Sequence, residues 1–408
     1  MLMDEIKRYA VGLDVGTENV RAVVAGVSDS GKISVVGYGE GKNTGMRKGV
    51  VSAVAGPSEA IDKMLAEVER MSGHTIRNAT VSINGSQILS AKVRGMVAVG
   101  AVDHEINEDD VDRLKEVAVT GQIPANRETL VAVPLSYTLD GQGGIKDPVG
   151  MTGARLEMTA SVVTALVPHC EALRKSTMNA DVVADRLIPS AVAAGRAVLD
   201  EKQLENGVAV IDMGAATTSV AVFEEGDLQY VGVVPEGSNN ITNDLAIVLK
   251  IDTEIADEIK CRFVTGNFKG GERKIVIKTG REELSFDRNE VNKIVEARLS
   301  EIFERVRKEL KVAHYDRRLP EGIVLTGGGA KMRDIEVCAR DMLEAAVKIG
   351  TPIKLGGVSD SVEKPEYAAA VGLMLMAIDG VDGGYVQEKK VYKSGGGFFK
   401  NLLNKFKF

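Results

Sequence analysis

Apolar and polar positions alternate between glycine turns over residues 7–56, a pattern that predicts a small antiparallel sheet. One strand of this pattern ends near Asp14, passes through a turn at Gly16 and continues as a second β-branched strand. The same order of features returns later in the chain, with Asp212 and Gly214 at the corresponding positions. Two strand–turn–strand units of this kind can face each other across a cleft. We therefore predict two related α/β halves with one carboxylate in each turn.

Helical periodicity separates these strand units. Pro57 opens a helix with one apolar face, and Asn107 caps a second helix with acids in its first turn. Residues 79–102 have the pattern of strands broken at Gly85 and Gly95. Further helices are predicted over 168–205 with an interruption at Pro189, over 239–262, over 287–311 and over 368–378, and further strands over 156–166, 274–278 and 323–326.

The two Asp-x-Gly turns contain the residue types that bind a phosphate chain and its cation. Gly16 lets the backbone approach oxygen atoms closely, and the N–H groups of the turn at Gly16 and Thr17 can donate to a phosphate. Asp14 and Asp212 suit Mg²⁺, because this ion keeps several waters and takes one or two carboxylates plus phosphate oxygens. A single Asp-x-Gly is an ordinary β-turn, but two copies with the same flanking pattern favour a nucleotide clamp.

A third turn, Gly327-Gly328-Gly329, lies between a predicted strand and a predicted helix. Three consecutive glycines leave a flat slot for an adenine or a phosphate, and the N-terminus of the following helix favours anions. Glycines also mark ordinary strand–helix junctions, so this turn alone is weak support. The patterns GxxxxGK[ST] and GxGxxG do not occur in the sequence, which excludes the phosphate loops that they describe.

The last eleven residues form an amphipathic pattern, in which the apolar side chains fall within an arc of about 140° at 100° per residue. A helix of this length spans roughly 16 Å, so it can lie on a membrane without crossing it. Residues 380–397 before it, which end in three glycines, are typical of a flexible linker and disfavour the alternative that the helix packs on its own protein. We expect membrane binding through Phe398, Phe399, Lys400, Leu402, Leu403, Lys405 and Phe406.

Composition limits which cellular compartments and which classes of partner fit this chain. At 408 residues, with 44% hydrophobic residues, the chain is long enough for two or more domains. A net charge of −7 argues against nucleic acid as a partner. The three cysteines are widely spaced, the N-terminus has no apolar signal segment, and no apolar run reaches the ~20 residues that span a bilayer. We therefore expect the body of the protein in the cytosol.

The order of the two phosphate turns and the glycine turn is similar to that in the actin, Hsp70 and sugar-kinase superfamily of ATP-binding folds. Within this superfamily, residues 139–157, LDGQGGIKDPVGMTGARLE, resemble a signature of the bacterial cell-division FtsA family. Residues 237–246 and 365–373 also resemble that family, and the similarity runs from about residue 9 to the C-terminus. The resemblance implies an actin-like fold, with two related mixed-sheet halves around a nucleotide cleft and a small α/β insertion.

The resemblance also implies a division of the chain into subdomains. The first half, subdomain 1A, takes residues 1–78 and 164–205. The FtsA-type inserted subdomain 1C takes residues 79–163. The second half consists of subdomain 2A at 206–237 and 321–379, which includes a closing helix onto 1A, and of subdomain 2B at 238–320. A linker at 380–397 and the membrane helix at 398–408 complete the chain.

The same resemblance implies that ATP and Mg²⁺ bind in the cleft, with the metal held through water by the two aspartates. Asp257 and Lys260, one helical turn apart, match a pair that contacts ribose and adenine, although a solvated salt bridge explains them equally well. Ala215 and Ala216 make the second turn poorer in glycine than in the family, and Ile188 stands where hydrolysing relatives place Glu or Gln. We therefore expect tight ATP binding with slow or negligible hydrolysis. The implied nucleotide-binding residues are Asp14, Gly16, Thr17, Asn19, Asp212, Gly214, Ala215, Thr217, Thr218, Gly237, Asp257, Lys260, Gly327, Gly328 and Gly329.

The implied function is that of a scaffold, and no catalytic residue is predicted. It would polymerise at the cytoplasmic face of the cell membrane at the division site, anchor filaments of the tubulin-like protein FtsZ, and recruit later division proteins through subdomain 1C. FtsZ is expected on residues 238–311, where Arg288, Arg298 and Glu301 are candidates, although a solvated helix face explains them as well. The alternatives are a pilus-assembly actin-like protein, which the tail disfavours, and a small-molecule kinase, for which no acid or base is evident.

Overall fold

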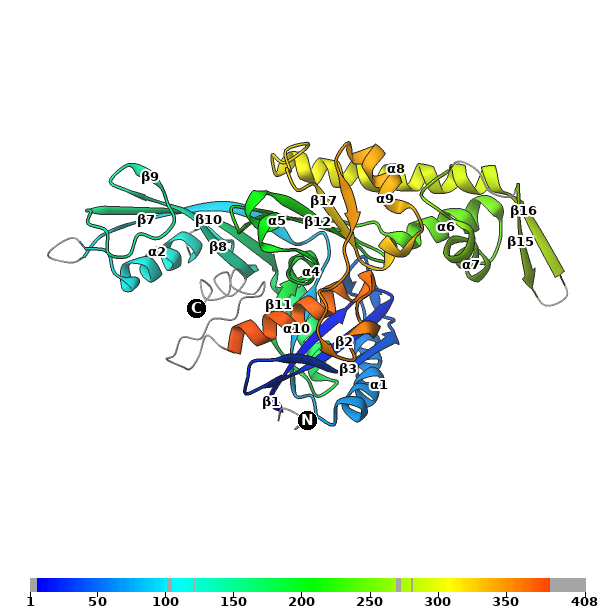
Figure 1. Ribbon diagram of the computed structural model, residues 1–408, viewed down its shortest axis with the longest axis horizontal. Helices are drawn as coiled ribbons and strands as arrows, with labels where there is room; N and C mark the ends of the chain where they lie inside the picture. The colour runs from blue at the N-terminus through cyan, green and yellow to red at the C-terminus, as the bar shows by residue number, and fades with distance from the viewer. Residues whose placement is uncertain (1–5, 101–104, 121, 269–272, 280–281, 382–408) are drawn as a thin grey trace.

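The computed structural model describes residues 6–100, 105–120, 122–268, 273–279 and 282–381. Two mixed sheets form the body of the molecule, and two smaller units extend from the body in opposite directions (Figure 1). Within the described residues, none of the helices is long and apolar enough to cross a lipid bilayer.

The first half is built on a six-stranded sheet in which β1, β2 and β3 are antiparallel neighbours and β6 runs parallel to β1. The strand order is β11 (Val183–Pro189), β6 (Asn78–Ile83), β1 (Ile6–Val15), β2 (Asn19–Ser28), β3 (Ile33–Lys42) and β19 (Gly356–Gly357). Successive side chains of a strand point to opposite faces. Val24 therefore packs with helix α1 (Ala55–Ser72), whereas Val23 packs with helix α10 (Ala368–Val381).

The second half repeats this plan in a five-stranded sheet. Its strand order is β14 (Asp227–Val234), β13 (Thr218–Glu224), β12 (Val208–Met213), β17 (Ile323–Thr326) and β18 (Val347–Ile349). The turns of the two halves close with the same hydrogen bond. The N–H of Gly16 donates to the carbonyl of Asn19 (3.0 Å), and the N–H of Gly214 donates to the carbonyl of Thr217 (2.8 Å). The prediction of two related halves is confirmed.

Helix α4 (Ser190–Val198) joins the two halves, since it contacts β11 of the first sheet and β12 and β13 of the second. Gly195 permits this approach, because a Cβ there would lie 2.9 Å from the ring of Phe223. One hydrophobic core consequently includes Leu13 from the first sheet together with Phe223 from the second. Helices α3 (Val167–Met178) and α5 (Glu201–Asn206) flank α4 in the chain.

The inserted unit is a four-stranded antiparallel sheet covered by one helix. Because β6 belongs to the first sheet, the insertion begins after that strand and not at residue 79. Gly95 does not break a strand as predicted: it lies inside β7, where a Cβ would be 2.7 Å from that of Ala118, so it lets the covering helix pack closely. The elements are β7 (Leu89–Ala98), α2 (Glu108–Thr120), β8 (Arg127–Leu139), β9 (Gln142–Ile145) and β10 (Arg155–Leu166).

The unit at the other end of the molecule combines three helices with a two-stranded sheet (Figure 1). Phe303 and Leu299 of its long helix are fully buried in a second hydrophobic core, which also contains Ile211 of the second sheet. The elements are α6 (Ser238–Leu249), α7 (Thr253–Phe263), β15 (Lys274–Thr279), β16 (Glu282–Asp287) and α8 (Arg288–Val312), and α9 (Ile335–Leu343) packs against α8.

The helical prediction for residues 168–205 is wrong in its middle, where β11 pairs in parallel with β6. This partner lies about 100 residues earlier in the chain, so local periodicity does not reveal it. The last core helix, α10, extends to Val381. Most of the predicted linker and the whole predicted membrane helix, residues 398–408, lie outside the described residues.

Candidate nucleotide site

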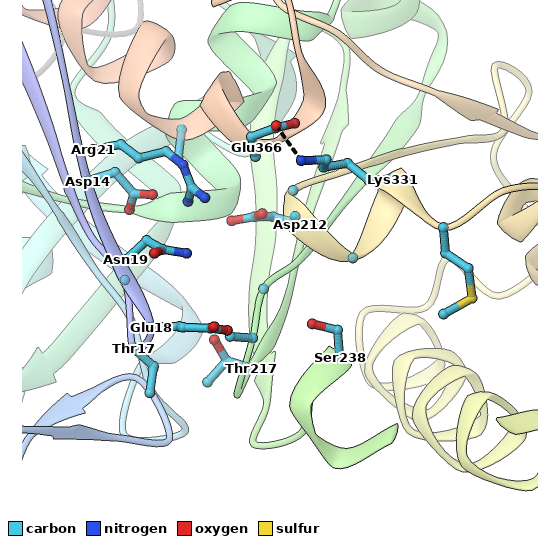
Figure 2. Close-up of a pocket in the computed structure, with 18 of the residues that line it drawn as sticks. Asp14, Thr17, Glu18, Asn19, Arg21, Asp212, Thr217, Ser238, Lys331 and Glu366 are labelled. Carbon is cyan, nitrogen blue, oxygen red and sulfur yellow. Dashed lines mark ion pairs between the residues drawn. The ribbon is translucent and has the colours of Figure 1, made fainter. Parts of the chain in front are cut away.

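A cavity of about 540 Å³ lies between the two halves, within the range of ~300–1,000 Å³ that is usual for small-molecule sites. Both Asp-x-Gly turns, helix α7 and the glycine turn contribute to its wall, and Figure 2 shows the side chains of both turns around one space. The predicted residues that line it are Asp14, Gly16, Thr17, Asn19, Asp212, Gly214, Ala215, Thr217, Asp257, Lys260, Gly327, Gly328 and Gly329.

Two predicted residues, Thr218 and Gly237, lie behind this wall. The hydroxyl of Thr218 is fully buried and donates to the carbonyl of Glu236 at 2.9 Å. A Cβ on Gly237 would lie 2.5 Å from the carbonyl oxygen of Gly214, so the glycine lets helix α6 begin against the second turn. Ser238, the first residue of α6, lines the cavity instead, and its N–H donates to the carbonyl of Gly214 at 2.9 Å.

Asp14 and Asp212 come from different halves, and their carboxylates point into the same space (Figure 2). Burial raises the pKa of Asp14 above its ordinary value, against a hydrogen bond with Ser82 and the positive charge of Arg21. Burial also raises the pKa of Asp212 to about 6; a hydrogen bond with Ser190 opposes this rise and the charge of Asp14 adds to it. A divalent cation between two such carboxylates would relieve their repulsion, so the pair fits Mg²⁺.

A polar network connects the two halves behind the carboxylates. The amide of Asn84 exchanges hydrogen bonds with the hydroxyl of Ser190, at 2.9 and 3.1 Å, and the hydroxyl of Ser219 donates to the Asn84 Oδ1 at 2.8 Å. Asn84 itself lines the cavity, whereas Ile188 is buried in β11 among the residues of the first core. No sequence motif indicated Asn84, because its partners are distant in the chain.

Arg21 is a cavity residue that the sequence motifs missed. It lies opposite Asp14 across the β1–β2 pair, and its guanidinium pairs with Glu40 at 2.6 Å and lies 5.7 Å from the ring centre of Tyr367. Its Nε is buried and has no hydrogen-bond partner within the described part of the chain. The alternation of β2 could have revealed Arg21, because residues two apart share a face and Asn19 was already predicted to bind.

Asp257 and Lys260 form the expected pair on α7 and also line the cavity. The Lys260 ammonium lies 2.6 Å from Asp257 and donates to the hydroxyl of Thr242 at 2.8 Å. Burial acts to raise the pKa of Asp257, but the hydrogen bond and charge of Lys260 hold it below its ordinary value. Asp257 and Lys260 therefore form a salt bridge and also line the cavity. The pair is not a fully solvated one, because the Lys260 side chain is only 12% exposed.

The three consecutive glycines have different roles. Gly327 has φ of 86°, and a Cβ there would lie 2.4 Å from the carboxylate of Asp212. A Cβ on Gly329 would lie 2.6 Å from the Met213 side chain, so both glycines let the turn pack against β12. A Cβ on Gly328 would meet nothing within 4 Å, because this residue faces the cavity.

A family model described as Cell division protein FtsA matches residues 209–372, and a model described as the SHS2 domain inserted in FTSA matches residues 85–164. The cell division protein FtsA of Pseudomonas aeruginosa is 34% identical over 375 residues, which cover 91% of this chain and 89% of that protein. The second model begins after β6, in agreement with the position of the insertion in the fold.

Solved structures show the same fold at lower identity. The PilM–PilN type IV pilus biogenesis complex aligns with a TM-score of 0.64 and 16% identity, covering 90% of this chain and 98% of that one. MreB5 of Spiroplasma citri bound to ADP aligns with a TM-score of 0.54 and 14% identity, covering 90% and 94%. The fold is therefore actin-like. The pilus protein shares that fold at much lower identity than the FtsA relative does.

Proposed function

Since this chain belongs to the FtsA family of cell division proteins, we propose that it binds ATP with Mg²⁺ in the cavity between its halves. The observation that carries this proposal is the pair Asp14 and Asp212, one from each repeated turn, facing a single cavity. The N–H groups of Gly16 and Gly214 close the two turns and are not available to a phosphate, contrary to the expectation for Gly16. The remaining N–H groups of the turns would hold the phosphates, the aspartates would hold the hydrated cation, and the glycine turn would contact the adenosine.

Hydrolysis should be slow, because the side chain that would orient the attacking water is replaced by Ile188. This residue is buried in β11, and an aliphatic side chain cannot accept a hydrogen bond from water. A purified sample should therefore retain bound ATP over many minutes with little release of phosphate. A robust magnesium-dependent release of phosphate would contradict this part of the proposal.

We further propose that the ATP-bound protein polymerises at the cytoplasmic face of the cell membrane and anchors FtsZ filaments at the division site. The C-terminal segment 398–408 would be the membrane anchor, with its apolar face in the lipid and its lysines near anionic headgroups. One short helix binds reversibly, so polymerisation would strengthen attachment by presenting many anchors at once. The inserted unit would recruit later division proteins.

The outer unit of α6, α7 and α8 is the proposed FtsZ-binding region. Within it, Arg298 forms two hydrogen bonds with Asp244 at 2.6 and 3.0 Å and a third with Glu301 at 2.8 Å, and its side chain is 19% exposed. Arg288 donates to the carbonyl of Phe263 at 3.1 Å. Arg288, Arg298 and Glu301 are therefore engaged in contacts within this unit. Ile247 on α6 is 72% exposed and is the sharper candidate for a partner contact.

Co-sedimentation tests the whole proposal. The full chain should pellet with anionic liposomes and carry FtsZ filaments with it in the presence of ATP, whereas a chain without residues 395–408 should stay in solution. Ile247→Asp should bind liposomes but lose FtsZ. The control is Ile353→Asp, because Ile353 is also an exposed isoleucine (41%) but lies outside the outer unit. Undiminished pelleting without the tail would contradict the membrane anchor, and equal FtsZ binding by both variants would contradict the α6 contact.

A further inference from the structure

Glu366 contributes a carboxylate to the cavity wall, and it belongs neither to the two phosphate turns nor to the glycine turn. It lies in the short helix η3 (Pro365–Tyr367), directly before α10, and is only 8% exposed. Its Oε1 accepts from the ammonium of Lys331 at 2.8 Å, whereas its Oε2 is buried and has no hydrogen-bond partner among the described residues. Because a buried polar atom without a partner is costly, the free oxygen indicates a ligand atom at this place.

The position of this carboxylate is fixed from two sides. The carbonyl of Pro365 accepts from the N–H of Gly327 and from the hydroxyl of Thr326, both at 3.1 Å, which fastens η3 to the glycine turn. On the other side, the ring of Tyr367 packs edge-on against Tyr38. Glu366 is therefore held at a constant distance from the glycine turn that would contact the nucleoside.

The local charge indicates which part of a nucleotide faces Glu366. Figure 2 shows Glu366 and Lys331 on one side of the cavity and Thr17, Thr217 and Ser238 on the other. Two cations lie near this carboxylate, and each is already paired, Lys331 with Glu366 itself and Arg21 with Glu40. Asp212 adds a further negative charge on this side of the cavity, so an anionic phosphate oxygen would be repelled at hydrogen-bond distance from Glu366. The complementary group is a neutral donor, either a hydroxyl or an amino group.

We propose that the free Oε2 of Glu366 accepts a hydrogen bond from a hydroxyl or amino donor of the nucleoside part of the ligand. Glu366 is thereby a residue that determines which nucleosides the cavity accepts, and Lys331 is a positioning residue that holds the other carboxylate oxygen. The inference rests on the proposed binding of ATP in this cavity. It adds a specificity contact that lies outside the three sequence motifs.

Calorimetric titration of the full chain with ATP, 2′-deoxyATP, 3′-deoxyATP and inosine triphosphate identifies the donor. Each analogue lacks one candidate donor, the 2′-hydroxyl, the 3′-hydroxyl or the 6-amino group. The analogue without the relevant donor should bind the wild type roughly 10- to 100-fold more weakly than ATP, the range for a hydrogen bond to a charged group. Glu366→Ala should bind ATP more weakly by a similar factor and should no longer distinguish that analogue from ATP.

Glu363→Ala is the matched control, because Glu363 lies in the same segment but accepts from the hydroxyl of Ser359 at 2.8 Å outside the cavity. Its discrimination should equal that of the wild type. Glu366→Met, which keeps the side-chain length but has no oxygen acceptor, replaces the alanine variant if the latter does not fold. Discrimination that persists unchanged in the Glu366 variant would overturn the inference while leaving ATP binding intact. Failure of the wild type to bind any of the nucleotides would instead overturn the proposed function itself.

Discussion

At the scale of single residues, the cavity contains two buried carboxylates, although burial disfavours their ionised forms. Asp14 and Asp212 are surrounded by protein, burial raises the pKa of both carboxyls, and the charge of Asp14 raises that of Asp212 further. Arg21 compensates part of this charge from the neighbouring strand. Such an arrangement is unfavourable in the ligand-free protein and would become favourable with a bound cation, as in the proposed Mg²⁺ site.

The raised pKa of Asp212 predicts a pH-dependent stability. Its pKa is about 6 in the folded protein against an ordinary value of 3.8, so the contribution of this group to stability is fully present below pH 4 and is lost as the pH rises through 6. Asp212→Asn imitates the protonated form. In EDTA without nucleotide, this variant should exceed the wild type in free energy of unfolding at pH 8 by up to about 3 kcal/mol.

Denaturant unfolding measured from pH 4 to pH 8 checks this expectation. The difference between Asp212→Asn and the wild type should disappear near pH 4. Asp62→Asn, at an exposed position on α1, should show no such pH-dependent gain. Parallel stability curves for Asp212→Asn and the wild type would show that burial does not shift this carboxyl.

Substitutions at different glycines of the glycine turn should affect ATP binding and folding stability separately. Gly328→Leu adds a side chain that points into the cavity, so it should lower ATP affinity by at least tenfold while the midpoint of thermal unfolding stays unchanged. Gly329→Ala adds a methyl group that collides with Met213, so it should destabilise the fold by about 1–3 kcal/mol. Equal loss of stability in both variants would contradict the assigned orientation of the turn.

At the scale of elements, the inserted sheet packs against β14 of the second half through buried apolar side chains, and polar contacts add to this packing. Lys146, directly after β9, lies 2.8 Å from Glu225 and 3.2 Å from Asp227, and it donates to the carbonyl of Leu135 at 3.1 Å. Asp227 is only 4% exposed, so its pairing with Lys146 occurs at a desolvated position. Lys146 therefore adds a polar bridge between the insertion and the second half to their apolar contact.

Lys146→Met should loosen this attachment, because it removes a cation from a buried carboxylate. We expect a loss of roughly 1–3 kcal/mol and faster hydrogen exchange in β14 and in the facing strands of the insertion. Exchange measured by mass spectrometry on the intact chain provides the test. Lys115→Met, which breaks a pair with the exposed Asp112 inside α2, is the control and should leave exchange in β14 unchanged.

At the scale of the whole molecule, the ligand should stabilise the contact between the halves. Both sheets contribute residues to the cavity wall, so the proposed ATP with Mg²⁺ would contact the two halves at once. At a ligand concentration of 100 times the dissociation constant, the free energy of unfolding should rise by about 2.7 kcal/mol. Removal of Mg²⁺ with EDTA should reverse most of this gain, as followed by thermal unfolding. Asp14→Asn should show a gain that EDTA does not change, and a full EDTA response in that variant would exclude Asp14 as a metal residue.

The sequence alone determined the features that local spacing encodes. The two Asp-x-Gly turns follow their strands at fixed intervals, the glycine turn follows β17, and the family resemblance lies in continuous stretches such as 139–157. Backbone conformation at a turn depends on a few adjacent residues, which explains why these predictions located most of the cavity wall.

Only the tertiary structure decided how distant residues meet. It paired β11 with β6, placed Glu366 beside Lys331, and brought Asn84 to Ser219 across the two halves. The same fold showed that Arg298 is engaged in internal ion pairs. Such contacts join residues separated by 35 to 135 positions, and periodicity extends over only a few turns of a helix or strand. The sequence therefore predicted the motifs of the cavity, whereas the packing of the two halves determined which further side chains complete it.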